Sequence, residues 1–277
     1  MTGFLNLNKP EGVSSAAVVN RAKWLTRTPC GHMGTLDPLA CGVLPVGVGN
    51  ATRLFDYFLQ KKKTYVARFV FGATTDTLDR EGEVILGGEV PSASQIERVL
   101  PSFVGEISQI PPRYSALSLG GKRGYELARS GAEFEFSARD VTVHSFRLCA
   151  QTAPDEFEFE IVCGAGTYIR ALARDVASAL GTQGYMSFLR REASGVFRME
   201  TAVSPESLTR ENVAEYLIPT QDVLPFPELG EVDGRIFHGI GVRADLPDGQ
   251  YKLRREGEFY GIARVENGVA RAEKKLC

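Results

Sequence analysis

The stretch TPCGHMGTLDPLACGVLPVGVGNAT, residues 28–52, consists mostly of glycines, prolines, small residues and aliphatic residues, and its one formal charge is Asp37. A carboxylate among apolar groups is costly unless it is paired and hydrogen-bonded. Pro38 biases Asp37 toward an extended conformation, and the flanking glycines permit tight turns and close approach by a ligand. The stretch therefore predicts an acid fixed on a rigid loop beside an accessible surface. A turn aspartate that caps local N–H groups is the alternative.

The totals describe an ordinary globular chain of 277 residues with 43% hydrophobic and 24% charged residues, long enough for one large domain and a small one. No apolar run approaches the roughly 18 residues of a membrane span. The N-terminal MTGFLNLNKP has no basic region followed by an apolar one. We therefore expect a cytoplasmic protein that does not bind membranes.

The cysteine pattern predicts neither a disulfide framework nor a metal site. The five cysteines are odd in number, scattered along the chain and free of any C-x-x-C pair. Cys30 and His32 suggest half of a metal site, but no second pair lies nearby. Because the chain also lacks a phosphate-cradling glycine motif and a dinucleotide fingerprint, we expect no metal and no cofactor.

Charge is distributed unevenly along the chain, although the net charge is only −2. Lys and Arg outnumber Asp and Glu by nine to three over residues 1–72, and by four to one over residues 113–129. Over residues 73–112 the ratio reverses to two against seven. Such a protein can present a basic face to a phosphate backbone, although chance clustering explains the pattern equally well.

Strands and helices do not alternate regularly, which predicts an α+β fold with a mixed, largely antiparallel sheet. Apolar periodicity predicts strands at residues 4–7, 63–72, 133–148, 156–166 and 185–198, with Tyr65 and Phe69 on one face of the second. Helices are predicted at 14–26, 51–59, 92–103, 123–131 and 167–181. The first is capped by Ser14 or Ser15, and the last is capped by Thr167 and stopped by Gly181. Near residue 225 the pattern changes to short apolar pieces between Gly and Pro-Asp-Gly turns, which predicts a small C-terminal β module.

A partner for Asp37 can be sought in GAGTYIRALARD, residues 164–175, where Arg170 follows a glycine-rich bend near the start of a helix. Arginine neutralises a carboxylate with two N–H groups and keeps its proton. Tyr168 lies at the same helix start, and Tyr65 lies on a strand. Each of these residues has core packing as its simpler explanation, but together they could line one pocket.

Several motifs in sequence order now allow a comparison. GHMGTLDPLACGVLPVGVGNATR resembles the catalytic-aspartate motif of the TruB family of tRNA pseudouridine synthases. Further similar segments are LNKPEGVSS, KKKTYVARFVFGATTDTLDREGEV, QIPPRYSALSLGGKRGYELARSG, CGAGTYIRALARDVASALG and SFLRREASGVF. They cover most of residues 4–200.

The resemblance implies an enzyme that isomerises uridine 55 in the T loop of tRNA. Asp37 would be the catalytic carboxylate, acting on the sugar either as a nucleophile or as a base. Arg170 would pair with Asp37, and Tyr65 would stack on the base. Tyr168 would lie beside the base and the Asp37–Arg170 pair. The remaining two site residues would be Leu189, an apolar pocket wall, and His32, which would enter the space left by the flipped nucleotide.

The resemblance also implies a domain organisation. The catalytic domain would span residues 1–224 and include an RNA-contacting insertion at 108–148. Its sheet core would be of pseudouridine-synthase type, and residues 230–277 would be a small β, reduced PUA-like domain. Seven basic residues are candidates for contacts to the tRNA backbone, although for each one taken singly a solvated surface charge is the favoured explanation: Lys61, Lys62, Lys63, Arg113, Lys122, Arg123 and Arg129.

Two other functions compete with a stand-alone enzyme. One is an RNA-binding folding factor in which modification is incidental, and the intact set of Asp37, Tyr65 and Arg170 argues against it. The other is a homologue that needs a guide RNA and protein partners, and the long basic insertion argues against that. We therefore expect a monomer that binds the T stem-loop of tRNA and needs no obligatory protein partner.

Overall fold

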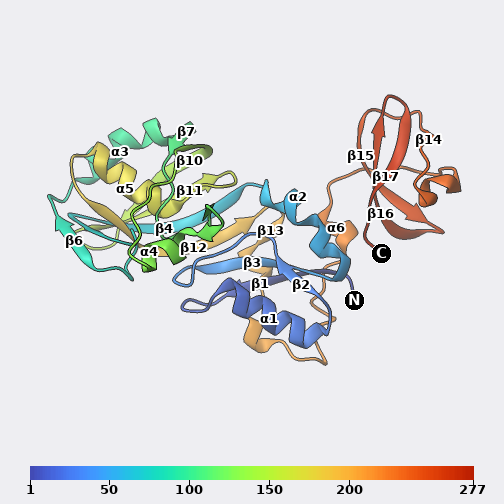
Figure 1. Ribbon diagram of the computed structural model, residues 1–277, viewed down its shortest axis with the longest axis horizontal. Coiled ribbons are helices and arrows are strands. Elements are labelled where there is room, and N and C mark those ends of the chain that lie inside the picture. Colours follow the sequence, from blue (N-terminus) through green and yellow to red (C-terminus); the bar gives the residue numbers. More distant parts are fainter.

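The computed structural model describes residues 1–277, apart from the side chain of Leu86. A nine-stranded sheet forms its centre, in the order β1-β3-β12-β4-β11-β10-β7, with β2 added to β3 and β13 added to β12 (Figure 1). Only β3 and β12 pair in parallel, so the predicted α+β fold with a largely antiparallel sheet is confirmed. The strands of this sheet are β1 Gly3–Lys9, β2 Cys30–His32, β3 Cys41–Val48, β4 Lys63–Phe71, β7 Gly105–Gln109, β10 Arg139–Gln151, β11 Glu156–Cys163, β12 Gly184–Ser194 and β13 Phe197–Arg198.

The sheet has two parts that meet at one short pairing. In that pairing Arg190 faces Cys41 and Arg191 faces Gly42. Helix α1 packs against the β1–β3 part, whereas α3 and α5 pack against the β4–β12 part (Figure 1). Residues that line the junction therefore come from elements far apart in the sequence.

The helices are short, and their ends follow from local residues. Helix α1 begins at Ser15 because the Ser14 hydroxyl accepts a hydrogen bond from the backbone of Ala17, as the sequence predicts. The predicted cap of α5 is wrong, because Tyr168 occupies the N-cap position and makes no side-chain capping bond. The helices are α1 Ser15–Thr26, α2 Phe55–Leu59, α3 Ala93–Val99, α4 Gly124–Arg129, α5 Ile169–Ala179 and α6 Thr220–Val223.

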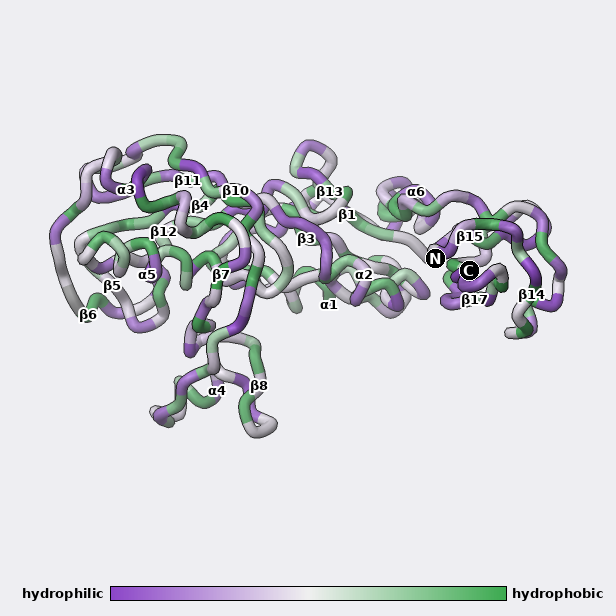
Figure 2. Tube along the Cα trace, turned by 90° about the horizontal axis from the view of Figure 1, so that it is seen from above, coloured by the Kyte–Doolittle hydropathy of each residue, from purple (hydrophilic) through white to green (hydrophobic). Residues whose placement is uncertain are grey.

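The insertion predicted at 108–148 divides into two parts. Strands β8 (Ser118–Leu119) and β9 (Lys122–Arg123) form a hairpin that projects with α4 away from the body (Figure 2). The strand predicted to begin at residue 133 begins instead at Arg139, because no neighbouring strand pairs with the preceding segment. Residues 139–148 therefore belong to the central sheet and not to the projection. A second hairpin, β5 Ala73–Thr75 with β6 Val84–Gly87, lies beyond β4.

The C-terminal residues form a separate antiparallel sheet in the order β14-β17-β16-β15. Its last residues dock on the segment that follows β3: Asn50 donates to the carbonyl of Cys277, and Arg53 donates to that of Lys275. Leu276 also joins a buried apolar cluster that includes Leu54. The four strands are β14 Val242–Arg243, β15 Gly249–Arg255, β16 Glu258–Glu266 and β17 Val269–Lys275.

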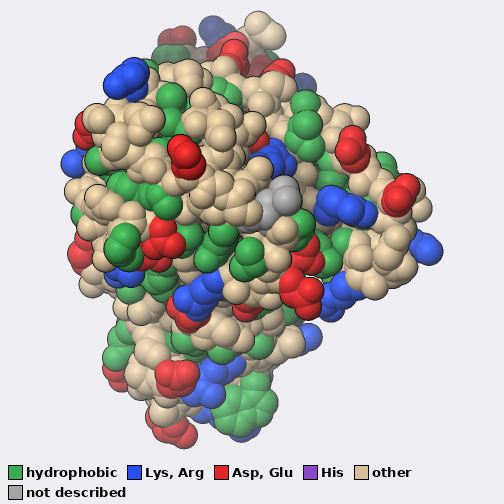
Figure 3. All heavy atoms as spheres, turned by 90° about the vertical axis from the view of Figure 1, so that its left-hand side faces the viewer, with side chains coloured by type: hydrophobic (Ala, Val, Ile, Leu, Met, Phe, Trp, Pro, Cys, Tyr) green, Lys and Arg blue, Asp and Glu red, His purple; other side chains and the backbone are tan. Residues whose placement is uncertain are grey.

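The surface at the end of the molecule that carries β6 and α3 shows Lys/Arg and Asp/Glu side chains interspersed (Figure 3). This face therefore carries no continuous patch of Lys and Arg side chains. None of the helices in the described part of the chain is long and apolar enough to span a bilayer.

Candidate active site

Asp37 lies on the loop between β2 and β3, and this loop is anchored at several points. The Arg191 side chain donates to the carbonyls of Gly34 and Val43, at 3.0 and 2.7 Å. The Ser15 hydroxyl donates to the carbonyl of Leu36 and accepts from its N–H group. The expected rigid loop is present because buried side chains satisfy its backbone groups.

A buried lysine provides a further anchor directly beside the acid. Lys9 is fully buried, and its ammonium donates to the carbonyls of Pro10, Val13 and Pro38, the last at 3.1 Å. Burial lowers the pKa of Lys9 to about 8. The loop therefore depends on a polar side chain from β1 as well as on its own prolines.

Asp37 and Arg170 form the expected ion pair. Arg170 Nη2 lies 2.9 Å from Asp37 Oδ2, and the side-chain exposures are 6% for the arginine and 38% for the aspartate. The acid is thus held by a buried guanidinium and open on its other side. Arg170 also donates to the carbonyls of Thr77 and Tyr114, which fixes the plane of the guanidinium.

A second carboxylate, Asp79, was not singled out from the sequence. Its Oδ2 lies 3.2 Å from Arg170 Nη1, and its side chain is only 6% exposed. Its Oδ1 accepts hydrogen bonds from the Thr77 hydroxyl and from the backbone of Glu81. The Asp79 carboxylate is therefore satisfied by the protein, whereas Asp37 keeps a free face.

A cavity of about 250 Å³ lies beside the ion pair. Five of the six residues expected in the active site line it, namely Asp37, Tyr65, Tyr168, Arg170 and Leu189. The structure therefore brings these five side chains together at one cavity.

Strand pairing explains one wall of this cavity. Tyr65 on β4 faces Arg191 on β12, and Leu189 lies two residues before Arg191 on the same side of the strand. Tyr65 is 7% exposed, and burial raises the pKa of its phenol. The ring is therefore neutral and bounds a largely apolar space.

Tyr168 is positioned from the opposite side by Gln109, at the end of β7. The Gln109 amide donates to the Tyr168 carbonyl and accepts from its N–H group, at 3.2 and 2.8 Å. Burial raises the pKa of Tyr168. This paired contact fixes the backbone of Tyr168 immediately before α5 begins.

His32 does not line the small cavity. It lines an adjoining depression of about 1000 Å³ that shares Asp37 and Arg170 with that cavity. Burial is the main cause that lowers the pKa of His32, and its Nδ1 has no hydrogen-bond partner. Next to it, Met33 is 1% exposed and belongs to the apolar core.

The seven candidate backbone contacts do not share one environment. Arg123 and Arg129, on the projecting insertion, line the larger depression beside Asp37. Lys63 differs from the expected surface cation, because it is 6% exposed and lines the small cavity. The other four line neither space and lie at exposed or half-buried positions: Lys61, Lys62, Arg113 and Lys122.

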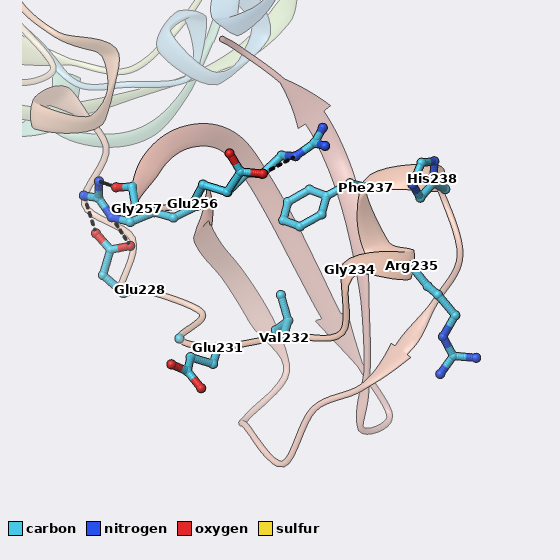
Figure 4. Close-up of a pocket in the computed structure, with 12 residues that line it drawn as sticks. Glu228, Glu231, Val232, Gly234, Arg235, Phe237, His238, Glu256 and Gly257 are labelled. Atoms are coloured by element: carbon cyan, nitrogen blue, oxygen red, sulfur yellow. Dashed lines mark hydrogen bonds and ion pairs between the residues drawn. The ribbon is translucent and has the colours of Figure 1, made fainter.

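Another depression, of about 1010 Å³, lies in the C-terminal sheet region (Figure 4). Its charged groups mostly pair with one another: Arg254 lies 3.0 Å from Glu228, and Arg255 lies 3.8 Å from Glu256. Both arginines are at least 39% exposed, so no carboxylate in these pairs is held by a buried guanidinium as Asp37 is. Among the described residues, no cluster of three or more His, Cys, Asp and Glu could hold a metal ion.

Comparison with solved structures defines the class of this fold and site. The chain aligns with the Cbf5 chain of a Cbf5-Nop10-Gar1 complex with a TM-score of 0.73 and 25% identity, over 99% of this chain and 85% of the other. The architecture is that of a pseudouridine synthase. Residues 22–169 match the model of the TruB family pseudouridylate synthase N-terminal domain, and the chain belongs to the TruB family.

Curated relatives agree over nearly the whole chain. The chain is 40% identical to tRNA pseudouridine synthase B of Clostridium kluyveri, over 95% of both chains. It is 42% identical to the protein of the same name from Synechocystis, over 90% of this chain and 87% of the relative. The similarity therefore includes the C-terminal region as well as the catalytic sheet.

Proposed function

We propose that this protein isomerises uridine to pseudouridine in tRNA, at position 55 of the T loop, with Asp37 as the catalytic carboxylate. The observation that carries the proposal is the Asp37–Arg170 ion pair at 2.9 Å, which leaves one face of the acid open to a small cavity. The names of the curated relatives support tRNA as the substrate.

A single free carboxylate suits this reaction. A glycosidase commonly uses two carboxylates, because water must be activated and a leaving group protonated. An isomerase that keeps the detached base needs no attacking water. Asp37 would either attack the sugar or remove a sugar proton, while apolar walls such as Leu189 exclude water that would divert the intermediate.

The uridine must leave its stack to reach Asp37, which costs a few kcal/mol. Stacking on Tyr65, worth roughly 1–3 kcal/mol, offsets much of that cost. His32 borders the larger depression, from which it would enter the space left by the flipped nucleotide. Arg123 and Arg129 line the same depression and would contact RNA phosphates there.

We propose a monomeric cytoplasmic enzyme that acts on the T stem-loop without a guide RNA or protein partner. The projecting insertion at residues 108–138 supports this proposal, because it supplies basic groups beside the acid. The C-terminal sheet would be a reduced PUA-like module that adds RNA contacts.

The test is tritium release from C5-labelled uridine in an unmodified tRNA transcript, with the purified protein alone. We expect turnover by the wild type and a loss of roughly 10³-fold or more in Asp37→Asn. Tyr65→Phe should retain most activity because it keeps the ring, whereas Tyr65→Leu should lose it. Equal rates for wild type and Asp37→Asn would end the catalytic assignment, and wild-type activity only with added partners would favour the guided alternative.

A further inference from the structure

Two buried cations line the small cavity without a carboxylate partner. Arg191 is 1% exposed and Lys63 is 6% exposed. Neither takes part in any ion pair among the described residues. Burying an uncompensated charge is costly, so two such residues at one site require an explanation.

The two cations lie next to each other below the loop that carries Asp37. A Cβ atom placed on Gly34 would lie 3.8 Å from Arg191 Nη1 and 3.8 Å from Lys63 Cε. Lys63 donates to the carbonyls of Leu59 and Lys61, at 2.7 and 2.9 Å. One of its three N–H groups therefore stays unused.

Arg191 also has N–H groups that do not donate to backbone carbonyls. It uses three N–H groups on the carbonyls of Val43, Thr35 and Gly34. A guanidinium carries five N–H groups, so two are not used on the backbone, and one of these interacts with the hydroxyl of Tyr65, which lines the same cavity. Burial and, to a smaller extent, the charge of Arg191 together lower the pKa of Lys63 to about 8, so Lys63 is still mainly protonated at neutral pH.

Arg170, the third cation of the cavity, is already balanced. It contacts the carboxylates of Asp37 and Asp79, so these three groups together carry a net negative charge. The positive charge that remains available to a ligand is therefore that of Arg191 and Lys63.

The proposed reaction generates an anion at this place. When the C1′–N1 bond breaks, its electron pair stays on N1 and the uracil becomes negatively charged. The sugar cation is neutralised by a bond to Asp37 or by loss of its 2′ proton to Asp37. The base then turns and C5 donates an electron pair to C1′. In the first route this attack displaces the Asp37 carboxylate from C1′, and in the second route Asp37 returns the proton to C2′. The C5 proton is lost to solvent and N1 takes up a proton, so Asp37 ends as it began.

We propose that Arg191, assisted by Lys63, stabilises the negative charge on the detached uracil while Asp37 acts on the sugar. This inference rests on the proposed function. The simpler role for Arg191 is purely mechanical, as a clamp that holds the loop at Gly34 and Thr35. The two roles differ in one respect, because only charge stabilisation depends on how readily the base leaves as an anion.

The experiment compares tRNA transcripts that carry uridine or 5-fluorouridine at the target position. Fluorine makes the detached base a weaker base and hence a better leaving group. Single-turnover rates are measured for wild type, Arg191→Met and Lys63→Met as the disappearance of the N-linked nucleoside after nuclease digestion. Circular dichroism and thermal unfolding identify variants that do not fold.

We expect Arg191→Met to lower the single-turnover rate about 100-fold on the uridine transcript. On the 5-fluorouridine transcript the loss in rate should be at least tenfold smaller. Lys63→Met should show the same trend with a smaller loss, which tests the inference even where Arg191→Met does not fold. Arg191→Lys keeps the positive charge but loses the two-pronged geometry of the guanidinium. Its single-turnover rate should change between the two transcripts by the same factor as the wild-type rate.

Equal losses on both transcripts, within twofold, for Arg191→Met and Lys63→Met would overturn the inference and leave Arg191 as a clamp. That outcome would leave the proposed function intact, because the wild type would still convert uridine. A wild type that leaves both transcripts unchanged would instead contradict the proposed function and this inference together.

Discussion

At the scale of single residues, Arg170 forms ion pairs with two carboxylates, Asp37 and Asp79, which differ in exposure. Asp79 is buried and fully hydrogen-bonded, whereas Asp37 is 38% exposed and open to the cavity. The buried acid compensates part of the guanidinium charge and holds its orientation. In the proposed function, Asp79 would therefore be a positioning residue and Asp37 the group that reacts.

We predict that Asp79→Asn lowers kcat by roughly 10–100-fold and leaves KM nearly unchanged, because Arg170 loses one partner and shifts against Asp37. Single-turnover rates over a range of enzyme concentrations separate the two constants. Asp76→Asn is the matched control, since Asp76 lies in the same turn but forms no ion pair with Arg170. Equal effects of the two substitutions would contradict a specific role for Asp79.

A second prediction concerns Lys63, whose buried amine has a pKa of about 8 in the folded protein against an ordinary value of 10.5. Between these values the unfolded chain binds a proton that the folded protein has lost, so the free energy of unfolding rises with pH. Lys63→Met removes this contribution. The free-energy difference between wild type and variant should therefore change by roughly 2–3 kcal/mol between pH 7 and pH 10.

Urea unfolding at the two pH values measures that difference. Lys62→Met provides the control, because Lys62 is exposed and no shift in stability with pH is expected from it. A difference for Lys63→Met that stays constant with pH would mean that its amine is not desolvated in the folded protein.

At the scale of elements, the junction of β3 and β12 determines whether the site forms. Gly42 adopts φ of +101°, and a Cβ atom there would lie 2.4 Å from the carbonyl oxygen of Arg191. Any side chain at this position would push the two strands apart. The glycine therefore permits the close pairing that brings the loop of Asp37 to the strand of Leu189.

We predict that Gly42→Ala lowers the free energy of unfolding by about 2–4 kcal/mol, through backbone strain and steric conflict. Gly31→Ala, in the same stretch, should cost less than about 1 kcal/mol, because the nearest atom to its added Cβ lies 3.8 Å away. Denaturant unfolding of both variants measures this contrast, and similar losses would contradict the strain argument.

Much of the element pattern is readable from the sequence, because it depends on local rules. Alternation along β4 predicts the buried face of Tyr65, and the serine before α1 predicts its cap. The start of β10 and the cap of α5 were predicted wrongly, because pairing with β7 and the amide of Gln109 decide them. Such distant partners leave no signal in the local sequence.

The site shows the same division. Asp37, Tyr65 and Arg170 stand out by motif, but Asp79 and Arg191 required the fold. A buried arginine without an acid partner looks in the sequence like one of two adjacent surface charges in SFLRR. Only the register of β12 against β4 identifies Arg191 as the one that faces inward.

At the scale of the whole molecule, the C-terminal sheet is attached to the catalytic sheet by shared core. Leu276 and Ile262 belong to the same buried cluster as Leu54 and Phe58. Hydrogen bonds between the 50–53 segment and the 274–277 segment add to this contact. The two regions are therefore expected to unfold together.

We predict that Leu276→Ala lowers the free energy of unfolding of the whole protein by about 2–4 kcal/mol. Leu246→Ala, at a position 36% exposed in the same module, should cost less than about 1 kcal/mol. Calorimetry should show one transition in both variants. An early separate transition in Leu276→Ala would show instead that the module unfolds independently.

The short junction between the two parts of the central sheet has one more consequence. The acid comes from one part, while the guanidinium, the aromatic wall and the leucine come from the other. With the residue roles proposed above, a partly folded chain would have no working centre and would not cut the glycosidic bonds of RNA during synthesis. Activity should accordingly appear during refolding only when the two parts of the central sheet have joined. The rate of turnover would then measure how much native protein has formed.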